Sequence, residues 1–268
     1  MTSKTFIVTG ASRGIGRSAT LFMVKNFQNN ILAISRSKDD LANLKQHVEV
    51  DLNLKDKLEI VVGDVAEEAI IDEAINKCLN KWKRIDGVVS NAGVIEPLGK
   101  IFDTNLEDWK RCFDVNFFSN VLLIQKILPH LRDTIKNGGN GGNIIFTSSG
   151  AAVKACYGWG AYCSSKTALN MLVKTLSIEE DIITSIAIRP GVVNTAMQKF
   201  IREKGDNTMS KNDHENYIKL YEDNELLSPD EPGYVISSLI NGNKNEIHKF
   251  SGRFISWNDE ALNNFNNK

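Results

Sequence analysis

The sequence predicts a doubly wound α/β fold, in which helices flank both faces of a seven-stranded parallel sheet. Two observations predict it. Short runs rich in β-branched residues alternate with longer amphipathic segments along the 268 residues, and a glycine-rich turn joins the first run to the first amphipathic segment. Nothing in the composition resembles an interdomain linker, so we expect a single domain over residues 1–268.

Strands are expected where a short apolar run is bounded by turn residues, as in Phe-Ile-Val at residues 6–8. In chain order the predicted strands cover residues 6–8, 31–34, 58–62, 88–89, 143–147, 184–188 and 251–256. Helices are expected where apolar residues recur at helical spacing between these runs. They cover residues 17–27, 38–50, 67–82, 106–132, 159–177 and 230–240.

Three segments lie outside this alternation. Residues 137–143 are glycine-rich but lead into a strand, and a phosphate-binding loop needs a helix after its glycines, so we expect a surface turn. Residues from about 195 to 226 are polar with a thin apolar pattern, which leaves two interpretations open: a mobile substrate lid or a solvated surface helix. The asparagine-rich residues 263–268 are expected to fray.

The overall composition argues against several classes of function. A formal net charge of -1 gives no basic excess for nucleic acid or an anionic membrane, and no apolar run approaches the length that spans a bilayer. The four cysteines have neither metal-site spacing nor the density of a disulfide scaffold, so we expect no metal. Reduced thiols and the absence of an evident targeting segment predict a cytoplasmic protein.

The residue pair most informative about chemistry is Tyr162 and Lys166. Residues four apart on a helix share a face, so the lysine ammonium is expected to lie beside the phenol and lower its pKa from an ordinary ~10 toward neutrality. Such a phenol can exchange a proton with an alkoxide or alcohol. Ser149, thirteen residues before Tyr162, can direct a hydroxyl at the developing charge. Together these residues predict carbonyl reduction by hydride transfer.

A glycine turn suited to a dinucleotide precedes the first predicted helix. Its spacing is Gly-x3-Gly-x-Gly, and the helix dipole and backbone amides there can face a pyrophosphate. Glycines at such a turn can also serve packing alone, which the downstream tyrosine–lysine pair disfavours. The cofactor-binding residues expected in this turn are Gly10, Ser12, Arg13, Gly14, Ile15 and Gly16.

Arg36 is the residue expected to select the cofactor. The second predicted strand ends Ile-Ser-Arg-Ser, and no acid for a ribose hydroxyl appears until Asp39. A guanidinium at Arg36, joined by Arg13, suits a 2′-phosphate, which indicates NADP(H). The alternative is that Arg36 is a solvated loop charge.

These motifs, in this order, resemble the short-chain dehydrogenase/reductase superfamily in its single-domain, Rossmann-type branch. The resemblance spans residues 4 to about 257 and also rests on Asn91-Ala92-Gly93, Asn116 and the Pro-Gly-x3-Thr run at 190–195. Within the superfamily, the Pro-Gly-Val-Val-Asn-Thr run is similar to a fungal and bacterial subgroup related to sepiapterin reductase that includes benzil reductases.

The resemblance implies a role for each catalytic residue. Tyr162 would be the general acid in reduction, while Lys166 would lower its pKa and hold the nicotinamide ribose hydroxyls. Ser149 would orient the carbonyl, with Ser148 as a rival donor that is expected to serve the loop backbone. Asn116 would support a water linking Lys166 to solvent, and hydride would leave from the pro-S face of the nicotinamide.

The resemblance also implies further cofactor-binding residues. Asp64 would lie beside the adenine, although it can equally cap the following helix, and Thr195 would hold the cofactor or cap a helix. The full additional set is Asp64, Val65, Asn91, Ala92, Gly93, Pro190, Gly191, Val193 and Thr195, besides Tyr162 and Lys166 themselves.

The substrate side is expected to be apolar and aromatic. Its candidate residues lie between Ser149 and Tyr162 and after the Pro-Gly turn, and they suit a flat or hydrophobic ketone. The alternative is that the large ones are core or interface residues. The candidates are Ala151, Tyr157, Trp159, Val192 and Met197.

The predicted function is therefore an NADPH-dependent reductase of a small hydrophobic carbonyl compound, for which the subgroup suggests a vicinal diketone such as benzil. Alternatives are an alcohol dehydrogenase, a 3-oxoacyl or pterin carbonyl reductase, and a non-enzymatic NADP(H) sensor. Apolar stripes on the helices at 106–132 and 159–177 match the pair that forms the dimer interface in this family, which favours a homodimer; packing on the sheet explains them equally.

Overall fold

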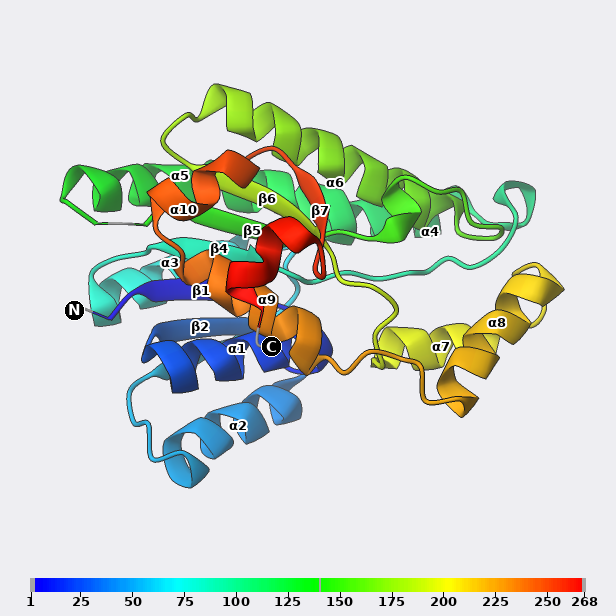
Figure 1. Ribbon diagram of the computed structural model, residues 1–268, viewed down its shortest axis with the longest axis horizontal. Helices are drawn as coiled ribbons and strands as arrows, with labels where there is room; N and C mark the ends of the chain where they lie inside the picture. Colours follow the sequence, from blue (N-terminus) through cyan, green and yellow to red (C-terminus); the bar gives the residue numbers. More distant parts are fainter. Residues whose placement is uncertain (1–2, 140, 267–268) are drawn as a thin grey trace.

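The computed structural model describes residues 3–139 and 141–266 of the chain. Its centre is a parallel sheet of seven strands in the order β3-β2-β1-β4-β5-β6-β7 (Figure 1). The strands are β1 Thr5–Thr9, β2 Asn30–Ser35, β3 Leu58–Val62, β4 Gly87–Ser90, β5 Asn143–Thr147, β6 Thr184–Arg189 and β7 Phe254–Ser256. The prediction of a doubly wound sheet is confirmed, and every predicted strand is present.

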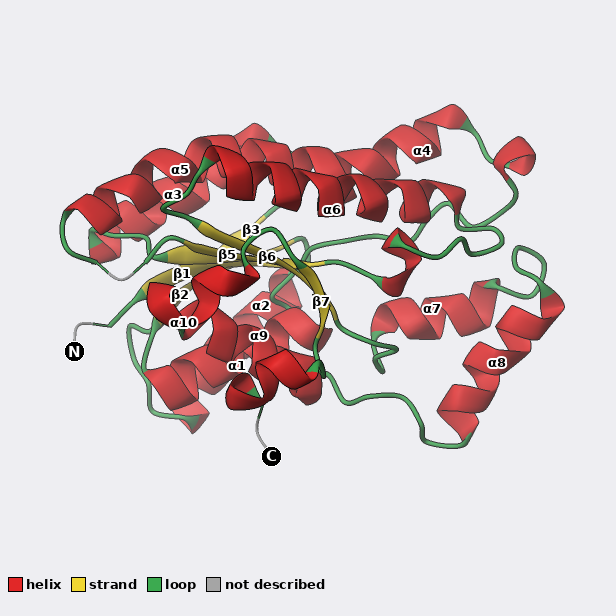
Figure 2. Ribbon diagram, turned by 45° about the horizontal axis from the view of Figure 1, so that its top comes forward, coloured by secondary structure: helices red, strands yellow, loops and turns green. Residues whose placement is uncertain are grey.

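Helices cover both faces of the sheet, as Figure 2 shows. Because the sheet is covered on both sides, its central strands are mostly apolar, and all five residues of β1 and of β5 are buried. One face carries α1 Gly14–Phe27, α2 Lys38–Gln46, α9 Asp230–Asn241 and the short α10 Lys244–Ile247; the other carries α3 Glu68–Trp82, α4 Leu106–Phe113, α5 Ser119–Lys136 and α6 Gly160–Glu179.

Strand order changes direction at β1, whose two neighbours are β2 and β4. Val8 of β1 is in register with Ala33 on one side and Val89 on the other. The helix after β3 therefore lies across the sheet from the helix after β1, and the loops after β1 and β4 separate at the carboxyl edge of the sheet. Ligands of doubly wound folds bind in this crevice.

The predicted helix at 106–132 is interrupted. A π-helical turn, Asp114–Phe118, separates α4 from α5, and α5 continues through Pro129 to Lys136. A second π-helical turn, His47–Asp51, follows α2, so the predicted helix at 38–50 also changes geometry near its end. Neither turn was predicted from the sequence, because the apolar spacing of each segment was interpreted as one continuous helix.

The polar segment after β6 forms two helices, α7 Ala196–Lys204 and α8 Lys211–Glu222. They project beyond the carboxyl edge of the sheet (Figure 1). The tail is ordered further than expected: a 3-10 helix covers Glu260–Phe265, where Leu262 is fully buried and the ring of Phe265 lies edge-on to Phe250. The prediction that the tail frays was therefore wrong up to residue 265. Residues 267–268 lie outside the described residues, and so does Asn140 of the predicted glycine-rich turn.

The apolar stripes on α5 and α6 face mainly inward. Ile127 and Val173 are fully buried in the cluster beneath the sheet, and Leu122, Leu128 and Leu172 pack against that cluster. Core packing therefore accounts for these stripes. Two other apolar side chains of α6 face outward, with Met171 61% and Ile178 78% exposed.

At the amino edge of the sheet, the buried carboxylate of Asp86 joins β1 to the loop before β4. It is fully buried, accepts the backbone N–H of Thr5 at 2.8 Å, and receives both Nε and Nη2 of Arg84, at 2.8 and 2.6 Å. A buried carboxylate costs free energy unless it is paired and hydrogen-bonded, and this one has both kinds of partner.

We therefore expect Asp86→Asn to lower the free energy of unfolding by about 3–5 kcal/mol, because it removes the negative charge that pairs with Arg84 from a fully buried position. Urea unfolding measures this. Glu107→Gln is the matched control: it breaks an exposed pair with Lys110 and is expected to cost no more than about 0.5 kcal/mol. Equal losses for the two variants would contradict the structural role of the Asp86 carboxylate.

Candidate active site

A cavity of about 590 Å³ opens at the carboxyl edge of the sheet. The loops after β1, β2, β3, β4, β5 and β6 all contribute to its wall, together with the start of α6 and residues of α7 and α8. The structure brings together in this wall every predicted site residue except Gly16, Asn116 and Tyr157. Residues from 10 to 217 thus converge on one cavity.

The glycine turn has the backbone that its residues require. Gly10 and Gly14 have φ of 65° and 55°, which side chains with a Cβ rarely adopt. A Cβ on Gly16 would lie 2.3 Å from the Gly10 carbonyl oxygen, so Gly16 serves close packing beneath the cavity. Helix α1 then begins without a side-chain cap and without an acid in its first turn, so its N-terminal amides are not occupied by a capping side chain of the described chain.

Tyr162 and Lys166 lie on the first turns of α6, facing the end of β5. Lys166 is 4% exposed; its Nζ donates to the Thr147 carbonyl at 2.9 Å and lies 5.9 Å from the centre of the Tyr162 ring. Ser149 follows β5 and its hydroxyl is hydrogen-bonded to the Tyr162 phenol. The three side chains therefore share one corner of the cavity.

The pKa of Tyr162 shifts in the direction opposite to the sequence-based expectation. Burial raises it to about 12, and the hydrogen bond from Ser149 offsets burial only in part. Burial likewise lowers the pKa of Lys166 to about 8. The expectation was wrong for this structure because the i, i+4 spacing fixes a shared helix face but does not determine burial, and the ammonium bonds to Thr147 instead of the phenol.

Asn116 lies in the π-helical turn and is fully buried beneath the cavity. Its Nδ2 donates to the Val94 carbonyl at 2.8 Å and to Ser165 Oγ at 3.1 Å, while its Oδ1 accepts the Val94 N–H at 2.9 Å. The side chain thus ties the loop after β4 to α6. Its backbone carbonyl accepts Nδ2 of Asn120 at 2.9 Å.

A second amide connects the glycine turn to the loop after β4. Asn91 Nδ2 donates to the carbonyls of Thr9 and Gly10, each at 3.2 Å, and the Thr9 hydroxyl accepts the N–H groups of Asn91 and Ala92. Thr147 Oγ1 donates to Asn91 Oδ1 at 3.2 Å. The loops after β1, β4 and β5 are therefore held by one network.

The structure shows the contacts of three residues for which alternatives were left open. Ser148 Oγ donates to Asn170 on α6 at 2.6 Å, so it serves that helix and not the loop backbone. Asp64 accepts the Ala66 N–H at 3.0 Å, but α3 is capped at Glu67, so Asp64 is not its N-cap. Thr195 is the N-cap of α7 and also lines the cavity.

Charged groups gather at the end of the cavity formed by β2 and β3. Asp64 pairs with Arg111 of α4 and lies 3.9 Å from Arg36, whose side chain is 62% exposed. Burial raises the pKa of Asp64, but the Ala66 N–H and Arg111 outweigh burial, so the pKa lies below its usual range. Ser35 Oγ lies 2.8 Å from Ser12 Oγ and joins this end to the glycine turn.

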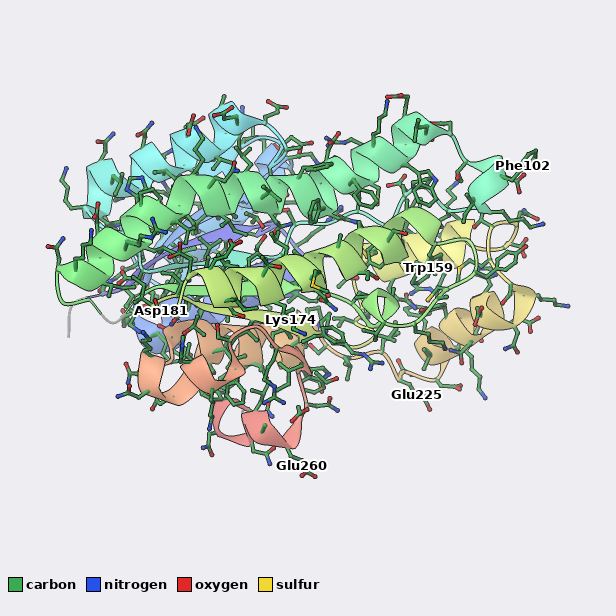
Figure 3. The ribbon with its side chains drawn as sticks, turned by 90° about the horizontal axis from the view of Figure 1, so that it is seen from above. Phe102, Trp159, Lys174, Asp181, Glu225 and Glu260 are labelled. Carbon is green, nitrogen blue, oxygen red and sulfur yellow. The ribbon has the colours of Figure 1, made fainter. Side chains whose placement is uncertain are left out.

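Aromatic side chains form the wall opposite the glycine turn. The Trp159 ring is edge-on to Tyr162 at 5.9 Å and is stacked on Tyr217 of α8 at 5.6 Å. Figure 3 labels Trp159 at the end of α6 that faces α7 and α8. Tyr157 does not line the cavity and is 47% exposed, because the turn before α6 directs it outward, so its predicted place in the substrate wall is not supported.

Known proteins share this architecture and these sequence features. Residues 4–206 match the family model of short chain dehydrogenases. The uncharacterized oxidoreductase YIR035C of Saccharomyces cerevisiae is 36% identical over 98% of both chains, and its crystal structure superposes with a TM-score of 0.89 over 99% of this chain and 100% of that one. The chain belongs to the short-chain dehydrogenase family.

Two further relatives have a named activity. The S. cerevisiae benzil reductase ((S)-benzoin forming) IRC24 is 36% identical over 97% of both chains. The Bacillus subtilis benzil reductase ((S)-benzoin forming) is 30% identical over 90% of this chain and 95% of its own. As a short-chain dehydrogenase, the chain is an oxidoreductase of CH–OH and C=O groups that uses a nicotinamide cofactor.

Sequence reasoning missed several cavity residues of this short-chain dehydrogenase. Gln198 and Ile201 of α7 line the wall, as do Tyr217 and Ile95. Tyr217 had a weak signal, since it is one of few aromatic residues in a polar segment, but its contact with Trp159 depends on how α8 folds back.

Among the residues described, no helix is long and apolar enough to cross a membrane, and no cluster of three metal-ligating side chains occurs.

We expect Gly16→Ala to weaken nicotinamide cofactor binding at least tenfold and to lower the free energy of unfolding by about 1–3 kcal/mol, because the new methyl displaces the Gly10 carbonyl. Cofactor fluorescence titration and urea unfolding measure the two effects. Gly138→Ala is the matched control: its φ is also positive, at 81°, but its Cβ would meet nothing within 4 Å. It is expected to lower stability and leave cofactor affinity unchanged; equal affinities for the Gly16 variant and wild type would refute this role of the turn.

Proposed function

We propose that this protein is an NADPH-dependent carbonyl reductase that transfers hydride to a small hydrophobic ketone or vicinal diketone, with Tyr162 as general acid. The observation that carries the proposal is the placement of Ser149, Tyr162 and Lys166 in one cavity with the glycine turn. A hydroxyl donor, a proton donor and a cation at the same corner match the negative charge that develops on a carbonyl oxygen when hydride adds to the carbonyl carbon.

The residues present fit a nicotinamide dinucleotide. The uncapped start of α1 offers backbone amides for a pyrophosphate. After β4, Asn91, Ala92 and Gly93 leave room for the cofactor: Gly93 has no side chain, and a Cβ there would lie 3.5 Å from Lys166 Nζ. Lys166 would hold the nicotinamide ribose hydroxyls, and residues 190–195 would hold the far side of the ring. When bound, the reduced cofactor supplies the hydride.

Three side chains then act on the substrate. The Ser149 hydroxyl donates to the carbonyl oxygen and orients it, and Tyr162 donates its phenolic proton to that oxygen as hydride arrives. The high pKa of the phenol keeps it protonated at neutral pH, as an acid must be, and the ammonium of Lys166 stabilises the phenolate that remains. Asn116 acts as a positioning residue through Val94 and Ser165.

NADPH preference rests on charge at the β2 end of the cavity. Arg36 and Arg13 both line it, and the Asp64 carboxylate beside Arg36 is paired with Arg111. The local charge is therefore positive, which favours a 2′-phosphate over a bare ribose hydroxyl.

A vicinal diketone is favoured by the opposite wall. Ala151, Trp159, Val192, Met197 and Tyr217 line it, and they suit an aromatic ring. The benzil reductases of S. cerevisiae and B. subtilis described above support the same substrate class.

The setting of the reaction is part of the proposal. We place the substrate lid in α7 and α8, because Tyr217 of α8 and Met197 of α7 both line the cavity. A homodimer through α5 and α6 draws support from the outward-facing apolar side chains of α6, Met171 and Ile178. A single domain and a cytoplasmic location remain predictions of the sequence.

The direct test is the loss of NADPH absorbance with a panel of carbonyls: benzil, isatin, other diketones and simple aldehydes. We expect rapid turnover of a diketone and a fall in kcat of about 10²–10⁴-fold in Tyr162→Phe, which keeps the ring but lacks the proton. The Phe variant is expected to bind NADPH as wild type does. Tight NADPH binding without turnover of any carbonyl would refute the reductase and favour a cofactor sensor.

Arg36→Ala is expected to raise the KM for NADPH about 10–100-fold and to leave the KM for NADH within about twofold, because only the 2′-phosphate loses its charge-assisted hydrogen bonds. Steady-state kinetics with both cofactors measures this. Arg132→Ala, which removes an arginine paired with Glu180 away from the cavity, is the matched control and is expected to change neither KM. An equal loss with both cofactors would contradict the role of Arg36.

The pH profile should report Lys166. Its pKa of about 8 means that the ammonium is present below pH 8 and is lost above it, whereas Tyr162 stays protonated to about pH 12. We expect kcat/KM for NADPH, which reports the free enzyme, to be level below pH 8 and to fall about tenfold per pH unit well above it. A level profile up to pH 10, in protein shown by circular dichroism to stay folded, would contradict this assignment.

A further inference from the structure

Two cysteines meet at the substrate side of the cavity. Cys156 lies in the turn before α6 and Cys163 in the first turn of that helix. Their sulfur atoms share one backbone acceptor, the Lys154 carbonyl, at 3.7 and 3.9 Å. Both thiols are partly exposed, whereas Cys78 and Cys112 are fully buried. The pair is therefore both close together and open to small reagents.

The two thiols differ in reactivity. The approach of the two thiols lowers the pKa of Cys163 and raises the pKa of Cys156. Cys163 also lies near the N-terminus of α6, where the helix dipole favours a thiolate. Cys163 is therefore the more readily ionised of the two, and its thiolate has a protonated thiol beside it. A low-pKa thiolate next to a second cysteine is the arrangement of a redox-sensitive pair.

We propose that Cys156 and Cys163 form a dithiol site that hydroperoxides oxidise to a disulfide, which closes the substrate side of the cavity. The Cys163 thiolate attacks one peroxide oxygen and breaks the O–O bond; with one proton this gives a sulfenic acid and water, or an alcohol from an alkyl hydroperoxide. The Cys156 sulfur then attacks the sulfenic sulfur, losing its proton, and hydroxide leaves as a second water. Two thiols lose two electrons, and the peroxide gains them.

The bridge would act on the substrate through Trp159. The closed loop of residues 156–163 contains Trp159, whose ring contacts both Tyr162 and Tyr217, and Cys156 itself lines the cavity. Drawing the turn onto α6 moves this aromatic wall. The glycine turn and Arg36 belong to other elements, so the bridge should raise the KM for the ketone and leave NADPH affinity unchanged. This consequence, unlike the disulfide itself, rests on the proposed reductase function.

Peptide mapping tests the site without reference to activity. Trypsin places both cysteines on one peptide, residues 155–166, and a second cut after Tyr157 or Trp159 separates them unless a disulfide joins the pieces. After hydrogen peroxide, alkylation of free thiols and digestion, we expect this peptide to lack alkylation, to have lost the mass of two hydrogens, and to stay joined after the second cut. Cys78 and Cys112 should be alkylated once the protein is unfolded.

Single substitutions assign the two steps. Cys156→Ser should stop at a sulfenic acid on Cys163 that dimedone traps, and Cys163→Ser should react with peroxide at least tenfold more slowly. Cys78→Ala, which removes a buried thiol outside the cavity, is the matched control and should form the bridge as wild type does. Oxidation of either cysteine without a bridge, or an equal peroxide rate in Cys163→Ser, would overturn the site.

The functional consequence has its own readout. Peroxide is first removed with catalase, and the KM for the ketone in each oxidised variant is divided by the KM of its own untreated form. We expect this ratio to be at least five in wild type and near one in Cys156→Ser. A dithiol reductant should restore the wild-type value. A bridge that forms without changing this ratio would overturn the closure of the cavity, and no turnover by untreated protein would refute the reductase function instead.

Discussion

The bond from Lys166 Nζ to the Thr147 carbonyl is the interaction on which the site depends. It joins α6 to the carboxyl end of β5 and holds an ammonium group almost wholly inside the protein. With the helix fixed there, Tyr162 faces Ser149, which lies two positions after the end of β5. Burial of the ammonium lowers the pKa of Lys166. The buried charge lies at the corner of the cavity where a carbonyl oxygen would acquire negative charge, which it would stabilise.

Around this bond, two asparagine side chains hold the loops together through hydrogen bonds. Asn91 joins the loops after β1, β4 and β5, and Asn116 joins the loop after β4 to α6. Because each amide donates and accepts, it satisfies the backbone groups that strands leave unpaired where they end. The loops that form the cavity are therefore rigid on the cofactor side, whereas α7 and α8, which close the substrate side, lie beyond the sheet.

The sequence alone predicted the sheet and most of the cavity, because both depend on local patterns: apolar runs of strand length, glycines at a turn, and helical spacing of Tyr162 and Lys166. It did not predict the π-turn at Asn116, which forms where that side chain reaches Val94 and Ser165, far apart in the chain. It gave the wrong direction for the pKa of Tyr162, since burial is a property of the packed molecule. Tyr157, and not Tyr217, was named as a substrate residue because Tyr157 lies close to Tyr162 in the sequence. Proximity in the sequence does not determine which ring reaches the cavity.

The most direct test of the account is to follow the transferred hydrogen itself. NADPH carrying deuterium at the pro-S position of nicotinamide C4 would be incubated with the protein and benzil, and the product analysed by mass spectrometry and NMR. The account predicts deuterium on the new carbinol carbon of the hydroxyketone, with no label on its oxygen after exchange into ordinary water. A product without deuterium on that carbon would contradict direct hydride transfer from the pro-S position, and a product labelled only by cofactor carrying deuterium at the pro-R position would contradict the proposed face of the nicotinamide.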